Sequence, residues 1–311
     1  MKIMVTGGAG FIGSHIIELA LSQGHEVAAL DDLSSGKVEN MPPGVQLYQV
    51  DIRDAAATRK AFQDFRPEAV SHQAAQASVS VSMKDPALDA QINVVGGLNV
   101  ADAAAQCGTS RFVFASTGGA IYGNIASGQA KEDAPKVPIS PYAINKLAFE
   151  MLLDVYRSAG KLSPTILRYA NVYGPRQDPH GEAGVVAIFL NRAKEHQELR
   201  VNAMREPGDD GCVRDYVYVG DVARANLDAL MGKWSQPLSN IGTGLPTSTK
   251  HLAEELLRRS PGSRSQLTYG PPRDGDIERS VLDGSIFREN AGNFVDLADG
   301  LDSTARWYHE K

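Results

Sequence analysis

The chain has 311 residues, of which 42% are hydrophobic, so it can bury a large core and its composition excludes a disordered protein. Its 31 basic and 37 acidic residues leave a net charge of −6, which excludes the generalised basic field that would hold nucleic acid or an anionic membrane. The two cysteines, Cys107 and Cys212, lie far apart without CxxC spacing, so we expect reduced thiols and neither a disulfide framework nor a metal site.

Short strand-like runs alternate with longer helical patterns through the first 171 residues. The first run follows Met1 directly, without the pattern of a signal peptide, and no apolar run is long enough to span a membrane, so we expect a cytoplasmic protein. Helices are predicted at 11–23 and 86–107. The predicted strands are residues 2–6, 26–30, 46–50, 68–72, 111–115 and 165–169.

This alternation predicts an α/β fold with a doubly wound parallel sheet. After Asn171 the alternation weakens and Gly-Pro clusters become frequent, although residues 214–230 and 238–244 again resemble strand, helix and strand. We therefore predict that residues 1–171 and 213–244 form one domain. Residues 172–212 and 245–311 would form a smaller, discontinuous C-terminal substrate-binding lobe.

A glycine-rich segment, TGGAGFIG, lies between the first predicted strand and the first predicted helix. Its glycines, Gly7, Gly10 and Gly13, permit a tight turn and a close approach of the backbone to a pyrophosphate, which the helix N-terminus attracts. A lone glycine pattern would often be an ordinary turn, but strand, loop and helix occur together here. The segment, with Phe11 and Ile12, predicts a Rossmann-type dinucleotide site.

The second predicted strand ends about 20 residues beyond this loop, at Asp31 and Asp32. A carboxylate at Asp31 can accept hydrogen bonds from the adenosine ribose and repels the 2′-phosphate of NADP, so NAD is the expected cofactor. Lys37 nearby is interpreted as a solvated loop residue. Asp51 would contact adenine or serve only as a helix cap. The other residues expected around the adenosine are Asp32, Ser35, Gly36 and Ile52.

Tyr142 and Lys146 are four residues apart and would lie on one face of a helix that Ser140 caps and Pro141 begins. A free tyrosine has a pKa near 10 and is a poor base at neutral pH. A nearby ammonium and the positive end of the helix dipole both stabilise a phenolate. We therefore predict that the pKa of Tyr142 is lowered.

The YAINK segment at Tyr142 resembles the YxxxK element of the short-chain dehydrogenase/reductase superfamily. Four further segments narrow the resemblance: HQAAQ (72–76), STGGAIYG (116–123), RYANVYGPRQ (168–177) and VRDYVYVGDVA (213–223). Together they resemble extended members of this superfamily that act on nucleotide sugars, and most of all UDP-glucose 4-epimerases. The resemblance implies a homodimer formed by helices 86–107 and 141–159. The additional cofactor-binding residues that it implies are Gln73, Ala74, Ala75, Gln76, Asn93, Tyr142, Lys146 and Tyr169.

The chain departs from this family at the third catalytic hydroxyl. The family has Ser or Thr four residues before the tyrosine of the YG pair, and Tyr122 places Gly118 at that position. Thr117, or else Ser116, would have to supply the hydroxyl.

The resemblance implies that NAD takes hydride from carbon 4 of the sugar while Tyr142 removes the hydroxyl proton, which produces a 4-keto intermediate. Related 4,6-dehydratases and decarboxylases need acidic residues where this chain has Gly119 and Ala120, and NADPH-consuming reductases are disfavoured by Asp31. Epimerisation needs neither, so we predict a UDP-hexose 4-epimerase. Epimerisation of a UDP-uronic acid or another modified sugar, and a non-catalytic nucleotide-sugar or NAD sensor, remain alternatives.

Residues on the substrate side are also implied by the resemblance. Arginine side chains suit phosphate groups well, and Arg214 and Arg273 match family arginines that contact the diphosphate. Ser280 replaces a bulky tyrosine beside carbon 2 of the sugar, so we hypothesise that N-acetylated sugars are accepted as well. The predicted substrate-binding residues are Thr117, Tyr142, Asn171, Gly184, Val185, Val186, Val201, Asn202, Arg214, Arg273, Asp276 and Ser280.

Overall fold

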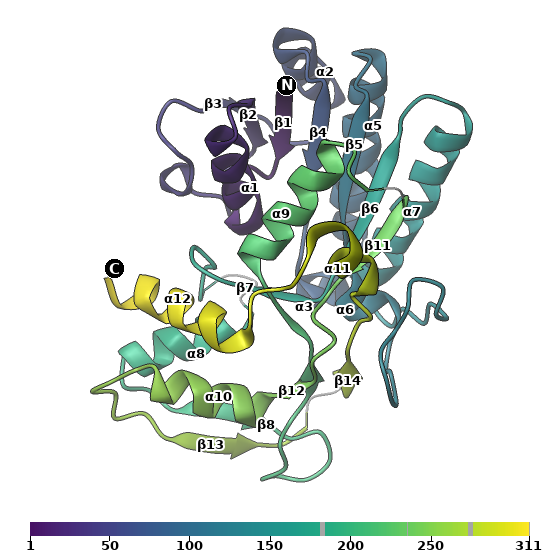
Figure 1. Cartoon of the computed structure of the whole chain (residues 1–311). Coiled ribbons are helices and arrows are strands. Elements are labelled where there is room, and N and C mark those ends of the chain that lie inside the picture. Colours follow the sequence, from purple (N-terminus) through teal and green to yellow (C-terminus); the bar gives the residue numbers. More distant parts are fainter. Residues whose placement is uncertain (181–183, 235, 273–275, 311) are drawn as a thin grey trace.

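The computed structural model describes residues 1–180, 184–234, 236–272 and 276–310, and within these residues its centre is a seven-stranded sheet (Figure 1). All neighbouring strands are parallel, in the order β11-β6-β5-β4-β1-β2-β3. The strands are β1 (Lys2–Thr6), β2 (Glu26–Asp31), β3 (Gln46–Gln49), β4 (Ala69–His72), β5 (Arg111–Thr117), β6 (Pro164–Tyr169) and β11 (Leu238–Ile241).

The first six of these strands confirm the strands predicted from the sequence, and the parallel sheet confirms the predicted fold class. Most positions of the inner strands are buried, as expected for strands that helices cover on both faces. The strand order reverses between β1 and β4. Open α/β sheets bind ligands at the carboxyl ends of the strands beside such a reversal, so this edge is where a site is expected.

Helices cover both faces of the sheet (Figure 1). On one face α1 (Phe11–Ser22) and α9 (Val219–Leu230) pack against each other and share a hydrophobic core with the strands. On the other face α2 (Ala55–Phe65), α5 (Gly97–Gln106) and α7 (Pro141–Ser158) contribute to a second core. The catalytic helix predicted from the YxxxK spacing is therefore a core-forming element as well.

The helix predicted over residues 86–107 contains a local irregularity. It consists of α4 (Pro86–Ala90), a π-helical turn η2 (Gln91–Gly96) and α5 in direct succession. Single π-helical turns occur frequently at functional sites. A β-carbon on Gly97 would lie only 2.8 Å from the Phe149 ring, so the small residue after this turn lets the helix approach α7.

A second lobe lies beyond the carboxyl ends of the strands, below the sheet in Figure 1. In it α8 (Val185–Lys194), α10 (Thr249–Arg258) and α12 (Leu297–Glu310) enclose a separate hydrophobic core. The strand β8 (Leu199–Asn202) pairs with β13 (Leu267–Gly270) at its edge.

Two small sheets connect the lobe to the central sheet. One has the order β12-β9-β14 and the other pairs β10 with β7, so residues 213–218 pair outside the central sheet, whereas α9 and β11 return to it. The division into two domains with the predicted boundaries stays a prediction. The strands are β7 (Asn171–Tyr173), β9 (Val213–Arg214), β10 (Tyr216–Tyr218), β12 (Thr247–Ser248) and β14 (Arg279–Ser280). The remaining helices within the described residues are η1 (Val38–Asn40), α3 (Val79–Lys84), α6 (Gly118–Ile121) and α11 (Ser285–Ala291).

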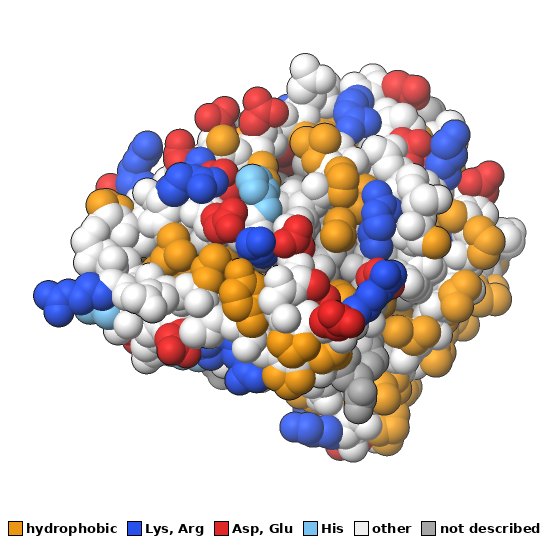
Figure 2. Space-filling view, turned by 90° about the horizontal axis from the view of Figure 1, so that it is seen from below, with side chains coloured by type: hydrophobic (Ala, Val, Ile, Leu, Met, Phe, Trp, Pro, Cys, Tyr) orange, Lys and Arg blue, Asp and Glu red, His pale blue; other side chains and the backbone are white. Residues whose placement is uncertain are grey.

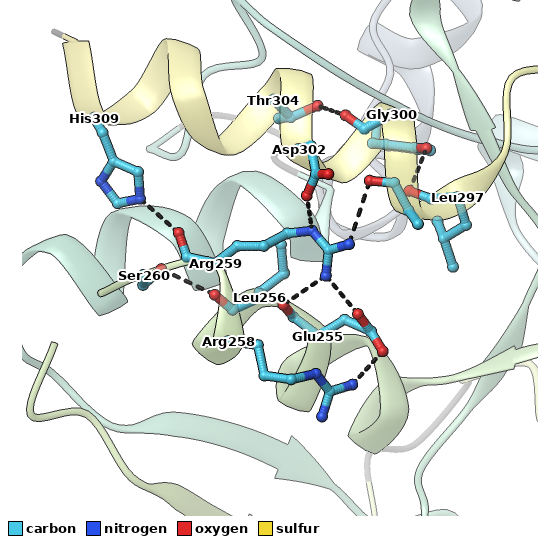
Figure 3. A network of polar contacts seen from close by, with 12 residues as sticks. Glu255, Leu256, Arg258, Arg259, Ser260, Leu297, Gly300, Asp302, Thr304 and His309 are labelled. Atoms are coloured by element: carbon cyan, nitrogen blue, oxygen red, sulfur yellow. Dashed lines mark hydrogen bonds and ion pairs between the residues drawn. The ribbon is translucent and has the colours of Figure 1, made fainter. Parts of the chain in front are cut away.

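An arginine at the end of α10 joins two helices of the second lobe (Figure 3). Arg259 forms ion pairs with Glu255 of α10 and with Asp302 of α12, the latter at 2.5 Å. Its carbonyl also contacts His309 Nε2 at 2.9 Å. These contacts align α12 with α10, although the partly exposed ion pairs contribute little stability each.

The surface seen from below carries dispersed charges of both signs with hydrophobic side chains between them (Figure 2). This face therefore presents no field of a single sign. Among the helices in the described part of the chain, none is both long and apolar enough to cross a membrane.

Candidate active site

The glycine-rich loop adopts a conformation that only glycine permits at two positions. Gly7 has φ +66°, and a β-carbon there would lie 2.7 Å from the backbone nitrogen of Ala74. A β-carbon on Gly13 would collide with the carbonyl of Gly7. Helix α1 begins beside this turn with Gly10 at its N-cap, a residue without a side chain to bond the free N–H groups of the first turn. The loop therefore fits a pyrophosphate.

Asp31 lies buried at the end of β2, beside this loop. Its carboxylate accepts hydrogen bonds from the backbone N–H groups of Ala9, at 3.0 Å, and Leu33, at 2.8 Å. Burial raises the pKa of Asp31, while these two hydrogen bonds oppose the rise. A β-carbon on Gly36 would lie 2.7 Å from Asp31 Oδ1, so the following loop closes tightly over the carboxylate.

The other residues predicted around the adenosine are less directly placed. Asp32 is exposed and accepts hydrogen bonds from the Ser34 backbone and hydroxyl, and Ser35 is also exposed. Asp51 forms an ion pair with Arg53, while the N-cap of α2 is Asp54. The capping alternative for Asp51 is therefore not the arrangement observed. Ile52 is buried, and a β-carbon on Gly96 would lie 2.7 Å from its side chain.

Asn93, inside the π-helical turn, fixes the backbone that follows β4. Its amide accepts a hydrogen bond from the Gln76 N–H at 3.1 Å and donates one to the Gln76 carbonyl at 2.9 Å. The Ala74 N–H donates to Thr6 Oγ1 at 3.2 Å, and Ala75 lies between these two fixed residues. The segment 73–76 is thus held at the reversal of the strand order.

Gln73 and Tyr169 join a buried network that sequence reasoning missed in part. Asn226 of α9 donates to the Tyr169 hydroxyl at 2.7 Å and accepts from Gln73 Nε2 at 3.0 Å. Burial raises the pKa of Tyr169 to about 12, so its phenol is neutral at physiological pH. No local motif singled out Asn226, because it meets the other two residues only through the packing of α9 on the sheet.

Helix α7 presents Tyr142 and Lys146 on its inner face. Ser140 caps the helix by accepting a hydrogen bond from the Ala143 N–H at 3.3 Å, and Pro141 is its first residue, as predicted. The buried Lys146 amine donates to the Ala115 carbonyl at 3.0 Å and lies 5.9 Å from the centroid of the Tyr142 ring. Burial lowers the pKa of Lys146 to about 8, and the charges of Asp89 and Glu150 oppose this.

The predicted lowering of the Tyr142 pKa is wrong for the protein by itself. Burial raises the pKa of Tyr142 to about 12, and the charge of Asp89 adds to the rise. A hydrogen bond with the Thr117 side chain lowers the pKa, but by less than burial raises it. The physical reason is that removing the phenolate from water destabilises it by more free energy than the hydrogen bond with Thr117 stabilises it.

The two candidates for the missing hydroxyl, Thr117 and Ser116, have different partners. Thr117, the last residue of β5, contacts the phenol of Tyr142. Ser116 instead donates to the buried carboxylate of Glu150. A β-carbon on Gly118 would lie within 3.0 Å of the Leu282 side chain, so a side chain at 118 has no room. The geometry thus favours Thr117 over Ser116.

A buried ion pair between Arg168 and Glu150 lies next to Ser116. Arg168 of β6 donates to both carboxylate oxygens of Glu150, at 2.9 and 2.5 Å, and to the Tyr122 hydroxyl at 2.7 Å. Both charged side chains are almost fully buried. Sequence reasoning missed this pair. A signal was present, because Tyr142, Lys146 and Glu150 follow each other at intervals of four residues and so lie on one face of the helix.

Asp89 and Asn145 were also missed. Asp89 is fully buried and accepts hydrogen bonds from Asn145 Nδ2 at 2.7 Å and from Gln76 Nε2 at 2.5 Å. It therefore connects the segment fixed by Asn93 to helix α7.

Small strands place the residues predicted for the sugar nucleotide. Arg214 in β9 pairs with Ser280 in β14, and the Arg214 guanidinium donates to the Val213 carbonyl at 3.0 Å. Asp276 is exposed, with Cys212 Sγ 4.0 Å from its carboxylate. Arg273 lies outside the described residues.

Other predicted substrate residues lie at element ends. A β-carbon on Gly119 would be 3.1 Å from Asn171 Oδ1, so Asn171 lies beside the turn that follows Thr117. Gly184 is the N-cap of α8, while Val186 and Val201 face the core of the lobe. The partly buried Val185 begins α8 and Asn202 ends β8.

Asp215, which sequence reasoning missed, fastens three segments around this region. Its carboxylate accepts hydrogen bonds from Thr243, from the Gly244 N–H at 2.9 Å and from the Leu282 N–H at 3.2 Å. These partners come from the end of β11 and from the chain after β14. The position of Leu282 against Gly118 is thus set by a buried carboxylate.

Comparisons with known proteins agree with this geometry. Residues 3–242 match a family model described as "NAD dependent epimerase/dehydratase family". A UDP-glucose 4-epimerase of Mycolicibacterium smegmatis is 41% identical over 100% of this chain and 99% of its own length.

Two solved structures have the same fold over nearly all of their length. A Thermus thermophilus UDP-glucose 4-epimerase in complex with NAD is 49% identical, with a TM-score of 0.94 over 99% of both chains. A UDP-N-acetylglucosamine 4-epimerase from Methanobrevibacter ruminantium, in complex with UDP-N-acetylmuramic acid, is 29% identical with a TM-score of 0.89, over 99% of this chain and 98% of the other.

Proposed function

The chain belongs to the NAD dependent epimerase/dehydratase family, and from this we propose that it inverts carbon 4 of a UDP-hexose with a tightly bound NAD. The observation that carries the proposal is the convergence of Thr117, Tyr142 and Lys146 beside a turn that lacks acidic residues. The first turn of α1, whose uncapped N–H groups follow the glycine-rich loop, and the carboxylate of Asp31 fit the pyrophosphate and the adenosine ribose of NAD.

Tyr142 is the proposed group that takes the proton from the sugar 4-hydroxyl and returns it. With a pKa of about 12 its phenol is protonated at neutral pH and cannot accept a proton, so proton removal depends on groups that stabilise the phenolate. Thr117 provides one hydrogen bond, and Lys146, held by the Ala115 carbonyl, provides a buried positive charge. When bound, NAD would supply the acceptor and donor of hydride for carbon 4.

The turn after β5 separates epimerisation from elimination. Gly119 and Ala120 have no acid–base capacity, and they lie in the short helix α6, two and three residues after Thr117. Elimination of water or loss of carbon dioxide would need a proton donor or acceptor there. Epimerisation needs no such group, because the 4-keto sugar only has to rotate and receive the same hydride on its other face.

We also propose that the site accepts N-acetylated sugars. Ser280 is buried in β14, next to Arg214 in the paired strand, and its side chain is far smaller than the tyrosine expected at this position in hexose-restricted relatives. The Methanobrevibacter relative acts on UDP-N-acetylglucosamine, which supports this range. Turnover of UDP-N-acetylglucosamine should accompany turnover of UDP-galactose, and its absence would restrict the proposal to hexoses.

A homodimer formed by α7 and the helical segment 86–107 is part of the proposal. The outer face of α7 exposes Ile144 (51%), Met151 (65%) and Val155 (62%), and Val95 on the neighbouring helix is half exposed. Four large apolar side chains on adjacent helices are typical of an interface. Light scattering should give twice the monomer mass, and Met151→Glu should shift the protein toward the monomer.

We also propose a cytoplasmic location, which rests on the state of the two cysteines. Cys107 and Cys212 are both free thiols in the described part of the chain, which suits a reducing compartment. Fractionation of cells that produce the tagged protein would test this.

The central experiment follows UDP-galactose by proton NMR with purified protein and no added NAD. Formation of UDP-glucose would establish both the reaction and a cofactor retained through turnover. Tyr142→Phe should lose activity, whereas Tyr156→Phe, near the other end of the same helix, should retain it. Conversion of only UDP-glucuronic acid in a parallel sample would favour the modified-sugar alternative, and full activity of Tyr142→Phe would contradict the catalytic assignment.

A further inference from the structure

The loop that follows Asp31 folds back onto the glycine-rich loop. The Lys37 N–H and Asn40 Nδ2 both donate to the carbonyl of Ala9, each at 2.9 Å. Asp31 accepts from the N–H of the same Ala9. Residues 32–40, which we call the adenosine loop, therefore border the place where the proposed function puts the adenosine half of NAD.

A single arginine fastens the far end of this loop. Arg176, which follows β7, donates through Nη1 to the Asn40 carbonyl at 2.9 Å, and through Nη2 it forms an ion pair with Glu18 of α1. Nη2 also lies 3.4 Å from His15 Nδ1, and His15 Nε2 contacts the Pro175 carbonyl at 2.9 Å. One guanidinium thus joins the adenosine loop, helix α1 and the chain segment that enters the second lobe.

The backbone of Arg176 indicates that this position is strongly determined by its surroundings. Arg176 has φ +70°, a left-handed conformation that is unfavourable for a non-glycine residue. Its side chain is only 15% exposed. Such a conformation persists where several contacts enforce it, and the guanidinium contacts with Asn40 and Glu18 are among them.

A second bridge lies beside the first. Lys37 Nζ of the adenosine loop forms an ion pair with Asp178 at 2.9 Å, and the side chains are 58% and 34% exposed. Asp178 is itself oriented by the His180 N–H at 2.9 Å. Because this pair is exposed, it should contribute less than Arg176.

We propose that Arg176 is a positioning residue that holds the adenosine loop closed and thereby sets the rate at which NAD is released. The inference rests on the proposed function, which places the adenosine beside Asp31. Release requires the loop to move away from Ala9, and this movement breaks the Arg176 contact with the Asn40 carbonyl. Arginine suits the role because its planar fork can hold several acceptors at once.

The test measures release directly. Protein loaded with NADH is mixed with excess NAD, and the decay of bound NADH fluorescence gives the dissociation rate. Arg176→Ala should accelerate release about tenfold, which corresponds to about 1.4 kcal/mol. The release rate of Arg176→Lys should lie between those of the wild type and Arg176→Ala, since one ammonium cannot reproduce the planar fork. Dilution of Arg176→Lys should lower its activity through loss of NAD, and added NAD should restore that activity.

Two further variants keep the test decisive if Arg176→Ala folds poorly. Lys37→Asp should accelerate release by a smaller factor, and Lys37→Asp with Asp178→Lys should restore the wild-type rate. The matched control is Lys233→Ala, which removes the exposed ion pair with Asp228 outside the adenosine loop and should leave release unchanged.

The outcomes separate the two proposals. Wild-type release rates in folded Arg176→Ala, Arg176→Lys and Lys37→Asp would overturn the inference and leave the proposed function intact. A wild-type protein that binds no NADH would overturn the proposed function and this inference with it.

Discussion

The side chain of Leu282 occupies the space that a side chain at position 118 would need, since a β-carbon on Gly118 would lie within 3.0 Å of Leu282 Cδ1. Leu282 is fully buried, and its N–H donates to the carboxylate of Asp215 at 3.2 Å. The glycine that departs from the resembled family is therefore matched by a leucine from a distant part of the chain. The adjacent Thr117 contacts Tyr142 instead.

We expect Gly118→Ser to destabilise the protein and not to supply a working hydroxyl. Forcing atoms into a packed core costs about 1–3 kcal/mol. Urea unfolding should show a loss of that size, and Gly118→Ser with Leu282→Ala should recover part of it. Equal stability of Gly118→Ser and the wild type would contradict the steric account.

Thr117→Val should lower kcat by about 100-fold, at the lower end of the effect of positioned acid–base groups. The valine keeps the shape of threonine but cannot bond the Tyr142 phenol. Thr117→Ser retains a hydroxyl and is the matched control. Initial rates with UDP-galactose measure both variants, and a rate of Thr117→Val close to wild type would shift the role to another group.

The depressed pKa of Lys146 predicts a stability that changes with pH. The folded-state pKa is about 8 and the unfolded value about 10.5, so between these values the unfolded chain binds more protons and stability rises with pH. The full cost of burying the charge, on the order of 3 kcal/mol, is present below pH 8. Urea unfolding at pH 7 to 9.5 should show the wild type gaining stability relative to Lys146→Met, and parallel profiles would contradict the assignment.

Removal of one partner of the buried Arg168–Glu150 pair should be more harmful than removal of both. Glu150→Leu leaves the Arg168 guanidinium buried without its carboxylate, at a cost of about 3–5 kcal/mol. The double variant Glu150→Leu with Arg168→Met should cost distinctly less. Urea unfolding of both variants measures the difference, and a larger loss of stability in the double variant than in Glu150→Leu would contradict this account.

Asp31 should determine the choice between NAD and NADP. Asp31→Ala should weaken NADH binding by about tenfold, the value of one hydrogen bond to a charged group. It should weaken NADPH binding less or strengthen it, because the repelling carboxylate is gone. Asp32→Ala is the control, since Asp32 is exposed and bonds Ser34. Fluorescence titration measures the affinities for NADH and NADPH, and equal affinities in the two variants would contradict the role of Asp31.

Much of the fold could be predicted from local patterns. The six strands, the glycine-rich turn and the Ser140 cap depend on residues that are neighbours in the sequence, where periodicity, φ preference and capping act directly. The family resemblance likewise rests on short segments of neighbouring residues. The resemblance also singled out Asn93, but its hydrogen bonds with the Gln76 backbone became apparent only with the structure.

What the sequence by itself determined is therefore the parallel sheet, the dinucleotide loop and the presence of Tyr142 and Lys146 on one helix face. Only the tertiary structure decided the environment of these groups. Burial raises the pKa of Tyr142 where spacing suggested a lowering, Leu282 accounts for Gly118, and Arg176 fastens a loop far from it in the chain. The physical reason is that solvation and steric exclusion depend on every atom near a group, and those atoms come from segments that only folding brings together.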